Sequence, residues 1–159
     1  MGTSLSFARV FDASNHAKST RNPVLFLRAK SIRKSAKVQI QERDTYLVLD
    51  DGGKIRQEYE EKMGATSPGR YWLRQMLDRD RVRTVVLRQM DRGTKAKLDE
   101  AHFHWGDVTF VRTARETISK RLVSEDHGVN ETRIRKILKK RLEVIVAMAG
   151  ETCASLGWR

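Results

Sequence analysis

Cysteine is almost absent from this chain, since Cys153 is the only one among 159 residues. A single cysteine excludes a disulfide framework and a zinc site built on cysteine ligands. Proline and glycine are scarce, at 2 and 10 residues, so no stretch rich in them marks a linker between domains. No apolar run approaches the roughly 20 residues that a membrane-spanning helix requires, and the N-terminus lacks the pattern of a signal peptide. We therefore expect one domain, residues 1–159, in the reducing cytoplasm and without a membrane partner.

Positive charge is what the chain has in excess. Lysine and arginine number 32 against 20 acidic residues, which gives a net charge of +12 and a pI near 10.3. Such an excess attracts polyanions, nucleic acid first and an acidic membrane surface second. Hydrophobic residues make up 39% of the chain, enough to argue against disorder. The composition therefore predicts a folded, basic domain that contacts nucleic acid.

Strands and helices are expected to alternate along the chain. Period-two and β-branched patterns predict strands at residues 5–11, 46–49, 82–87, 121–124 and 142–148. Helical periodicity and start signals predict helices at residues 23–38 and 54–62, from Ser67-Pro68, from Gly106-Asp107, over 132–141, and at the C-terminus. The helix that begins at Gly106-Asp107 is expected to bury Phe110, Val111, Ala114 and Ile118. Strands separated by helices indicate an α/β fold of three layers, α/β/α, around a central and mainly parallel sheet.

Carboxylates stand where such a fold forms its sites, at the carboxyl ends of strands and the starts of helices. Asp12 follows the first strand, Asp126 follows the strand 121–124, Asp107 opens a helix, and Glu58 lies one helical turn beyond Asp50-Asp51. Clustered carboxylates repel one another unless a cation neutralises them. Oxygen ligands suit magnesium or manganese, which activate water and stabilise charge on phosphate.

Each of these residues also has an ordinary structural interpretation. Asp107 is in a position typical of a helix cap. Asp12 and Asp126 are in positions typical of turns, and Glu58 could lie on a solvated helix face. The Asp50-Asp51 pair competes with Glu58 for the place facing a metal.

Four motifs carry a resemblance to a known family. They are Asp12-Ala13-Ser14-Asn15 after a strand, Ile55-Arg56-Gln57-Glu58-Tyr59 in a helix, Gly106-Asp107-Val108-Thr109-Phe110-Val111 at a helix start, and Leu122-Val123-Ser124-Glu125-Asp126 at a strand end. Taken in order, this set resembles the acidic motifs of PIN and PIN-like nucleases, and the resemblance covers nearly the whole chain. The residues after Asp126, His127-Gly128-Val129-Asn130, depart from the family pattern, which usually continues with an acidic or aromatic residue.

The resemblance implies a PIN-like endonuclease that hydrolyses phosphodiester bonds, in RNA more often than in DNA, with Mg²⁺ or Mn²⁺. Asp12, Glu58, Asp107 and Asp126 would be its catalytic metal ligands, with Glu58 bound directly or through water. Ser14 and Ser124 would orient the carboxylates, and Asn15 would hold the scissile phosphate. A role as a toxin-like or defence effector, pairing as a homodimer and control by a regulatory protein are further expectations drawn from the family.

Two basic stretches without acidic residues are expected to hold nucleic acid on either side of this cluster. The candidate phosphate contacts are Lys30, Arg33, Lys34 and Lys37 on one helix face, and Arg133, Lys136 and Lys140 on a second helix. Contacts of this kind position the nucleic acid and carry no sequence information. Either run could instead be an ordinary solvated face. Trp105, close to Asp107, is the aromatic residue best placed to stack on a base.

Two alternatives use the same residues differently. A PIN-like module that has lost its chemistry would bind nucleic acid or assemble with a partner without cleaving. A phosphatase-like hydrolase of small phosphate esters would also use aspartates and magnesium. That hydrolase would need an Asp-x-Asp motif after the first strand, which Asp12-Ala13-Ser14 does not supply.

Overall fold

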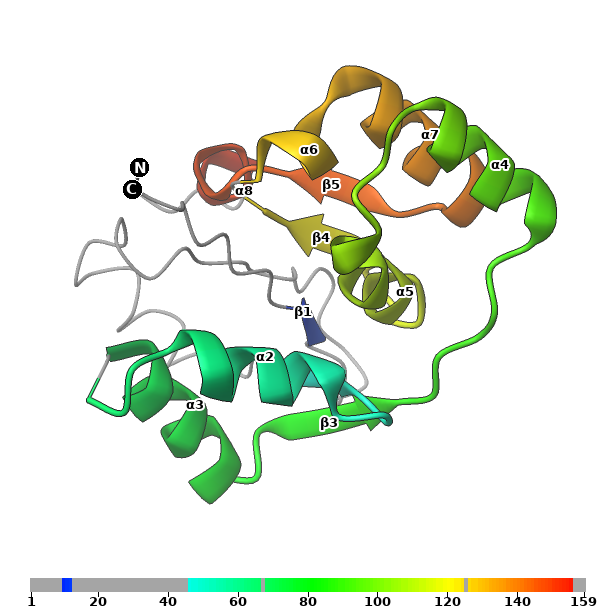
Figure 1. Ribbon diagram of the computed structural model, residues 1–159. Coiled ribbons are helices and arrows are strands. Elements are labelled where there is room, and N and C mark those ends of the chain that lie inside the picture. The colour runs from blue at the N-terminus through cyan, green and yellow to red at the C-terminus, as the bar shows by residue number, and fades with distance from the viewer. Residues whose placement is uncertain (1–9, 13–45, 67, 125, 156–159) are drawn as a thin grey trace.

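Strands and helices alternate in the computed structural model, which describes residues 10–12, 46–66, 68–124 and 126–155 (Figure 1). The strands are β1 Val10–Asp12, β2 Tyr46–Asp50, β3 Val82–Val85, β4 Arg121–Val123 and β5 Ile145–Ala147. Each coincides with part of an expected strand. The expected helix at residues 23–38 lies outside the described residues. The predicted α/β mixture of helices and strands is confirmed.

The described strands form two sheets instead of one. The first has the order β1-β2-β3, and the second pairs β4 with β5. β2 pairs with β3 and β4 with β5 in parallel, whereas β1 pairs with β2 antiparallel, so that Asp12 lies opposite Tyr46. Two of the three described pairings are parallel, as expected, but the expectation of one sheet differs from the two that the described strands form. Helical and strand periodicity give the order of elements but not the direction in which a distant strand returns, because a long connection allows either direction.

The described helices include those expected after residue 50, each of which begins close to its sequence signal, and two that were not expected. They are α2 Lys54–Lys62, α3 Pro68–Asp78, α4 Arg92–Glu100, α5 Val108–Arg115, α6 His127–Asn130, α7 Thr132–Leu142 and α8 Ala149–Ser155, with a 3₁₀ turn, η1 Trp105–Asp107, before α5. Gly53 precedes α2 with a φ of 69°, a conformation that favours glycine. No helix among the described residues is long and apolar enough to cross a membrane.

Helix α4 and the single turn α6 were not expected. The Asp91 side chain starts α4 by accepting hydrogen bonds from Thr94 N at 2.8 Å and Thr94 Oγ1 at 2.6 Å. This capping signal was present in the sequence, but α4 buries few side chains, chiefly Thr94 and Leu98. The apolar stripe of α4 is therefore too short for its periodicity to indicate a helix.

The two sheets are joined through α5. This helix contacts β1 and β2 of the first sheet, β4 of the second, and α2. Phe110 of α5 is 1% exposed, and its ring centroid lies 6.3 Å from that of the fully buried Tyr59 on α2. Phe110, Val111 and Ala114 are buried as predicted.

The prediction that Ile118 continues this buried face is wrong, because Ile118 is 74% exposed. Helix α5 ends at Arg115. Thr117 then accepts a hydrogen bond from Lys120 N through its hydroxyl, at 3.0 Å, and turns the chain toward β4. The helical period therefore stops before it reaches Ile118.

Candidate acidic site

Asp107 lies at the junction between η1 and α5, with its side chain 23% exposed. Its carboxylate makes no capping hydrogen bond to the start of α5. His104 Nδ1 lies 3.6 Å from Asp107 Oδ2. The interpretation of Asp107 as an ordinary helix cap is therefore wrong, and its carboxylate is directed to other partners.

Two further carboxylates act on Asp107. Burial raises the pKa of Asp107 to about 6, and the negative charges of Asp126 and Glu58 raise it as well, against the opposing effect of His104. These acids come from three separate parts of the chain, α2, η1 and the start of α6. The fold thus brings Glu58 and Asp126 within electrostatic reach of Asp107.

Glu58 and Asp107 line the same pocket of about 420 Å³ between α2 and η1. The side chain of Glu58 is 24% exposed, and its Oε1 accepts a hydrogen bond from Lys62 Nζ at 2.5 Å. Lys54 also lines this pocket. The two lysines stand four residues before and four after Glu58, a spacing that the sequence analysis did not use although it places all three on one helix face.

Asp126 lies at the start of α6 in a network of short-range hydrogen bonds. Its Oδ1 accepts from Gly128 N at 2.7 Å, so that the side chain caps α6. Its own backbone N–H donates to Ser124 Oγ at 3.0 Å. One carboxylate oxygen of Asp126 therefore has the local role that the turn interpretation expects. Ser124, which is 2% exposed, holds the Asp126 backbone.

Asn130 completes this network and was missed by the sequence analysis. Its Nδ2 donates to the carbonyl oxygens of Ser124 and Asp126. Asn130 Oδ1 is buried without a hydrogen-bond partner. The distance of four residues from Asp126 to Asn130, across one helical turn, is the sequence signal that could have found it.

The Asp50-Asp51 pair does not take the place of Glu58. Asp50 is 3% exposed, and its two carboxylate oxygens accept hydrogen bonds from Lys54 N at 2.9 Å and Ile55 N at 2.8 Å. Asp50 is therefore committed to the first turn of α2, and Asp51 is exposed on the turn.

Part of the predicted site lies outside the described residues. The backbone of Asp12 ends β1, but its side chain is outside the described part of the structure. Ser14, Asn15 and the basic residues Lys30, Arg33, Lys34 and Lys37 lie outside the described residues altogether. Within the described ranges, no group of three His, Cys, Asp or Glu side chains could hold a metal ion together.

The basic residues of α7 differ in the acids around them, and Arg135 pairs with Glu151 of α8 at 3.2 Å. Helix α7 packs beside α4, and the charges of Arg133 and Arg141 act on the α4 acids Glu100 and Asp91. Lys136, Lys139 and Lys140 are exposed. The three phosphate contacts predicted on this helix, Arg133, Lys136 and Lys140, are all exposed, and Arg133 has a small electrostatic effect on Glu100.

Trp105 is held in a defined orientation beside Asp107. Its Nε1 donates to Asp99 Oδ1 at 2.7 Å, and its ring meets that of Phe103 edge-on, with centroids 5.5 Å apart at 90°. The residue remains 37% exposed. An oriented, partly exposed indole is suited to stacking on a base.

Comparisons with known proteins do not identify a relative of this site. No protein-family model matches the chain, and neither a curated protein nor a solved structure matches it.

Proposed function

We propose that this chain is a PIN-like, metal-dependent endonuclease, with Glu58, Asp107 and Asp126 as the centre of its active site. One observation carries the proposal: Asp107 is largely buried, and the charges of Asp126 and Glu58, from two other elements, act on it, so that its pKa rises to about 6. Bringing like charges together costs free energy, and such arrangements occur most often at functional sites. The sequence motifs that resemble PIN-like nucleases contain these same three residues.

The chemistry of the donor set fits a hard divalent cation. The three side chains offer only oxygen ligands, which suit Mg²⁺ or Mn²⁺ better than zinc. Mg²⁺ usually keeps several waters and takes one or two carboxylates together with substrate phosphate. Asp107 and Asp126 would hold the ion, Glu58 would bind it directly or through water, and Asp12 would complete the set from the end of β1.

The bound ion would supply an activated water and stabilise the charge that develops on the phosphate. The chain's own residues would bind and orient the substrate around it. Lys54 and Lys62, on the wall of the same pocket, would attract the neighbouring phosphates, and Lys136 and Lys140 would hold more distant ones. Asn130 and Ser124 would keep Asp126 in place through its backbone.

The finer features of the proposal come from the family resemblance. A three-layer PIN-like fold would place β1 between β2 and β4, and the contacts of β1 with both strands support this arrangement. RNA is the favoured substrate over DNA. We also propose a cytoplasmic, toxin-like or defence role, with a homodimer as its assembly and a regulatory protein as its control.

A second candidate is a nucleic-acid-binding or assembly module of the same fold without catalysis. It is favoured by the finding that, within the described residues, no three potential ligands are arranged to hold one metal ion. Such a module would bind nucleic acid equally well with and without a divalent cation.

Cleavage of labelled single-stranded RNA and DNA in Mg²⁺ or Mn²⁺ separates the two candidates. We expect metal-dependent cleavage that falls by more than about 100-fold in the Asp107→Asn/Asp126→Asn double variant, since both substitutions remove direct ligands. Asp51→Asn is the matched control, because Asp51 is exposed outside the acidic cluster, and it should cleave like the wild type. Binding of the oligonucleotide without cleavage in either metal would reject the nuclease in favour of the module.

A further inference from the structure

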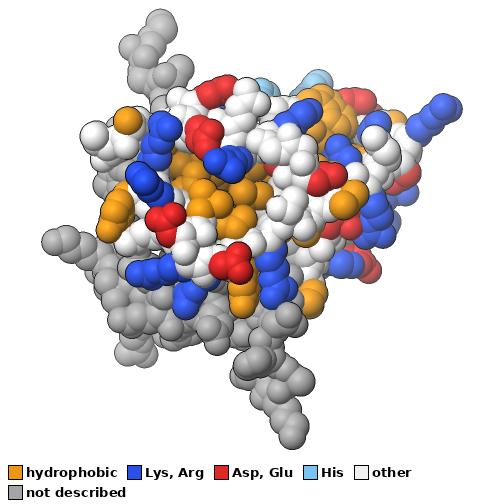
Figure 2. All heavy atoms as spheres, turned by 90° about the horizontal axis from the view of Figure 1, so that it is seen from below, with side chains coloured by type: hydrophobic (Ala, Val, Ile, Leu, Met, Phe, Trp, Pro, Cys, Tyr) orange, Lys and Arg blue, Asp and Glu red, His pale blue; other side chains and the backbone are white. Residues whose placement is uncertain are grey.

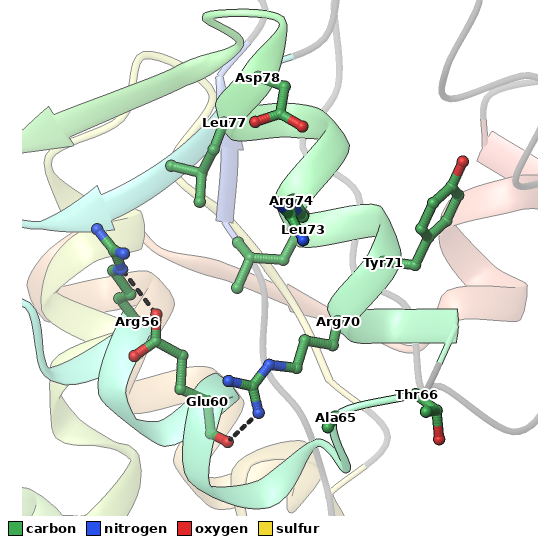
Figure 3. A pocket seen from close by; sticks show the side chains of 10 residues that line it. All are labelled: Arg56, Glu60, Ala65, Thr66, Arg70, Tyr71, Leu73, Arg74, Leu77 and Asp78. Carbon is green, nitrogen blue, oxygen red and sulfur yellow. Dashed lines mark hydrogen bonds and ion pairs between the residues drawn. The ribbon is translucent and has the colours of Figure 1, made fainter.

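A second, larger hollow lies on another side of α2 from the acidic pocket. It occupies about 780 Å³ between α2 and α3, and Figure 3 shows the side chains around it. Arg56 and Glu60 of α2 line this groove, whereas Glu58 lines the acidic pocket. Residues two apart on a helix do not face each other. Helix α2 therefore separates the two hollows and contributes to both.

Three arginines, Arg56, Arg70 and Arg74, line the groove together with two acids, Glu60 and Asp78. Arg56 Nε donates to Glu60 Oε1 at 2.9 Å, and Arg70 Nη1 donates to the Glu60 backbone carbonyl at 3.3 Å. Glu60 thus accepts hydrogen bonds from the guanidinium groups of both helices, as the dashed lines in Figure 3 mark. Arg74 lies exposed one turn beyond Arg70 on α3. Guanidinium groups match the geometry of phosphate oxygens, which they bind through paired donors.

Exposed aromatic and apolar surface adjoins these cations. The Tyr71 side chain is 65% exposed, and Leu77 is 36% exposed beside the buried Leu73. Figure 2, which views the molecule from this side, shows hydrophobic side chains gathered in the middle of the face with charged side chains around them. Bases stack on exposed aromatic rings whatever their identity, while a positive groove follows the backbone.

We propose that the α2–α3 groove binds an unpaired stretch of nucleic acid, with phosphates at Arg70 and Arg74 and a base on the Tyr71 ring. The inference rests on the proposed nuclease function, since it extends the path of the same substrate strand across α2. The groove has three arginines against two acids, and this balance together with the net charge of +12 of the chain favours a polyanion as the occupant. The groove gives the strand a second point of attachment away from the bond that is cut.

The test measures binding without cleavage. A fluorescein-labelled single-stranded RNA is titrated with the full chain in EDTA, by fluorescence anisotropy, at several salt concentrations. For single strands, each phosphate contact contributes about 0.7 to the slope of log affinity against log salt. We expect the slope to fall by about 0.7 in Arg74→Ala and by about 1.4 in Arg70→Ala/Arg74→Ala.

Tyr71→Ala should give a different signature. Loss of stacking is expected to weaken binding by about tenfold without a change in the salt slope, because no charge is removed. Arg92→Ala, which removes an exposed arginine from α4, is the matched charge control and should leave affinity and slope as in the wild type. Circular dichroism melts establish that each variant is folded, and Arg74→Ala alone serves if the double variant unfolds.

Unchanged affinity and slope in Arg74→Ala and unchanged affinity in Tyr71→Ala would overturn the inference. So would wild-type protein that does not bind the RNA. Because all binding is measured in EDTA, a failure to cleave in Mg²⁺ or Mn²⁺ would reject the nuclease while leaving the expected binding signatures intact. The two proposals can therefore fail separately.

Discussion

At the scale of single residues, the carboxylate of Asp107 decides how the site behaves with pH. Burial and the charges of Asp126 and Glu58 raise its pKa from 3.8 to about 6. The folded state therefore holds the ionised form of Asp107 less favourably than the unfolded chain does. Above pH 6 this carboxylate lowers the free energy of unfolding. The free energy of unfolding rises again as the pH falls from 6 toward 4, because Asp107 takes up its proton in the folded state at a higher pH than in the unfolded chain.

Asp107→Asn should accordingly stabilise the metal-free protein. At pH 7.5 in EDTA we expect the free energy of unfolding to rise by about 1–2 kcal/mol, a value reduced for the partial exposure of the side chain. The gain should disappear near pH 4, where the wild-type carboxylate is also neutral in the folded state. Urea denaturation at the two pH values measures the difference.

Asp51→Asn is the control for this prediction, since Asp51 is an exposed turn residue and should leave stability the same at both pH values. Equal stability of Asp107→Asn and the wild type at pH 7.5 would contradict the repulsion between the three carboxylates. A stabilised variant that no longer cleaves would show that the strain belongs to the active site.

At the scale of elements, α7 presents two kinds of positive charge. Arg133 and Arg141 act on acids of α4, and Figure 1 shows the two helices side by side. Lys136, Lys139 and Lys140 are exposed. Phosphates should be attracted more strongly by the lysines, because a cation that already interacts with carboxylates gains less from a second anion.

We expect Lys136→Gln/Lys140→Gln to weaken RNA binding more than Arg133→Gln/Arg141→Gln. Both variants lower the net charge by two, so a difference between them reports position and not total charge. The lysine variant should reduce the salt slope of binding by about 1.4, as for two lost phosphate contacts on a single strand. Fluorescence anisotropy over a salt series measures both effects, and equal loss in the two variants would indicate a nonspecific effect of net charge.

At the scale of the whole molecule, the acidic site depends on the helix that joins the two sheets. Asp107 directly precedes α5, whose Phe110 packs against Tyr59 on α2, the helix that carries Glu58. The packing of these two rings therefore contributes to the position of Asp107 relative to Glu58. A change in the core at this point should alter stability and the site together.

Phe110→Ala should lower the free energy of unfolding by about 3–5 kcal/mol, because it leaves a cavity where a ring was 1% exposed. This is a large share of the ~5–15 kcal/mol that keeps a domain folded. Phe110→Leu should cost less, and Val86→Ala, at a residue that is 74% exposed, should change stability by less than about 0.5 kcal/mol. Urea denaturation measures the change in the free energy of unfolding for all three variants. Similar changes for Phe110→Ala and Val86→Ala would contradict the contribution of the Phe110 ring to the core.

Local features could be predicted because they depend on neighbours in the chain. The bounds of α2, the start of α7 and the position of β2 follow from apolar periodicity and capping residues. Helix α4 was missed because its buried stripe is short, and Ile118 was misplaced because the turn at Thr117 interrupts the period of α5. These errors are also local and arise from competing signals within a few residues.

The sequence by itself determined the positive charge, the alternation of strands and helices, and which acidic residues stand at the ends of those elements. Only the tertiary structure decided that Asp50 is used by the first turn of α2, and that the charges of Glu58 and Asp126 act on a buried Asp107. It also decided the antiparallel pairing of β1 with β2. The physical reason is that periodicity and capping act over one or two helical turns, whereas the distance between charges on separate elements is set by how their buried faces pack.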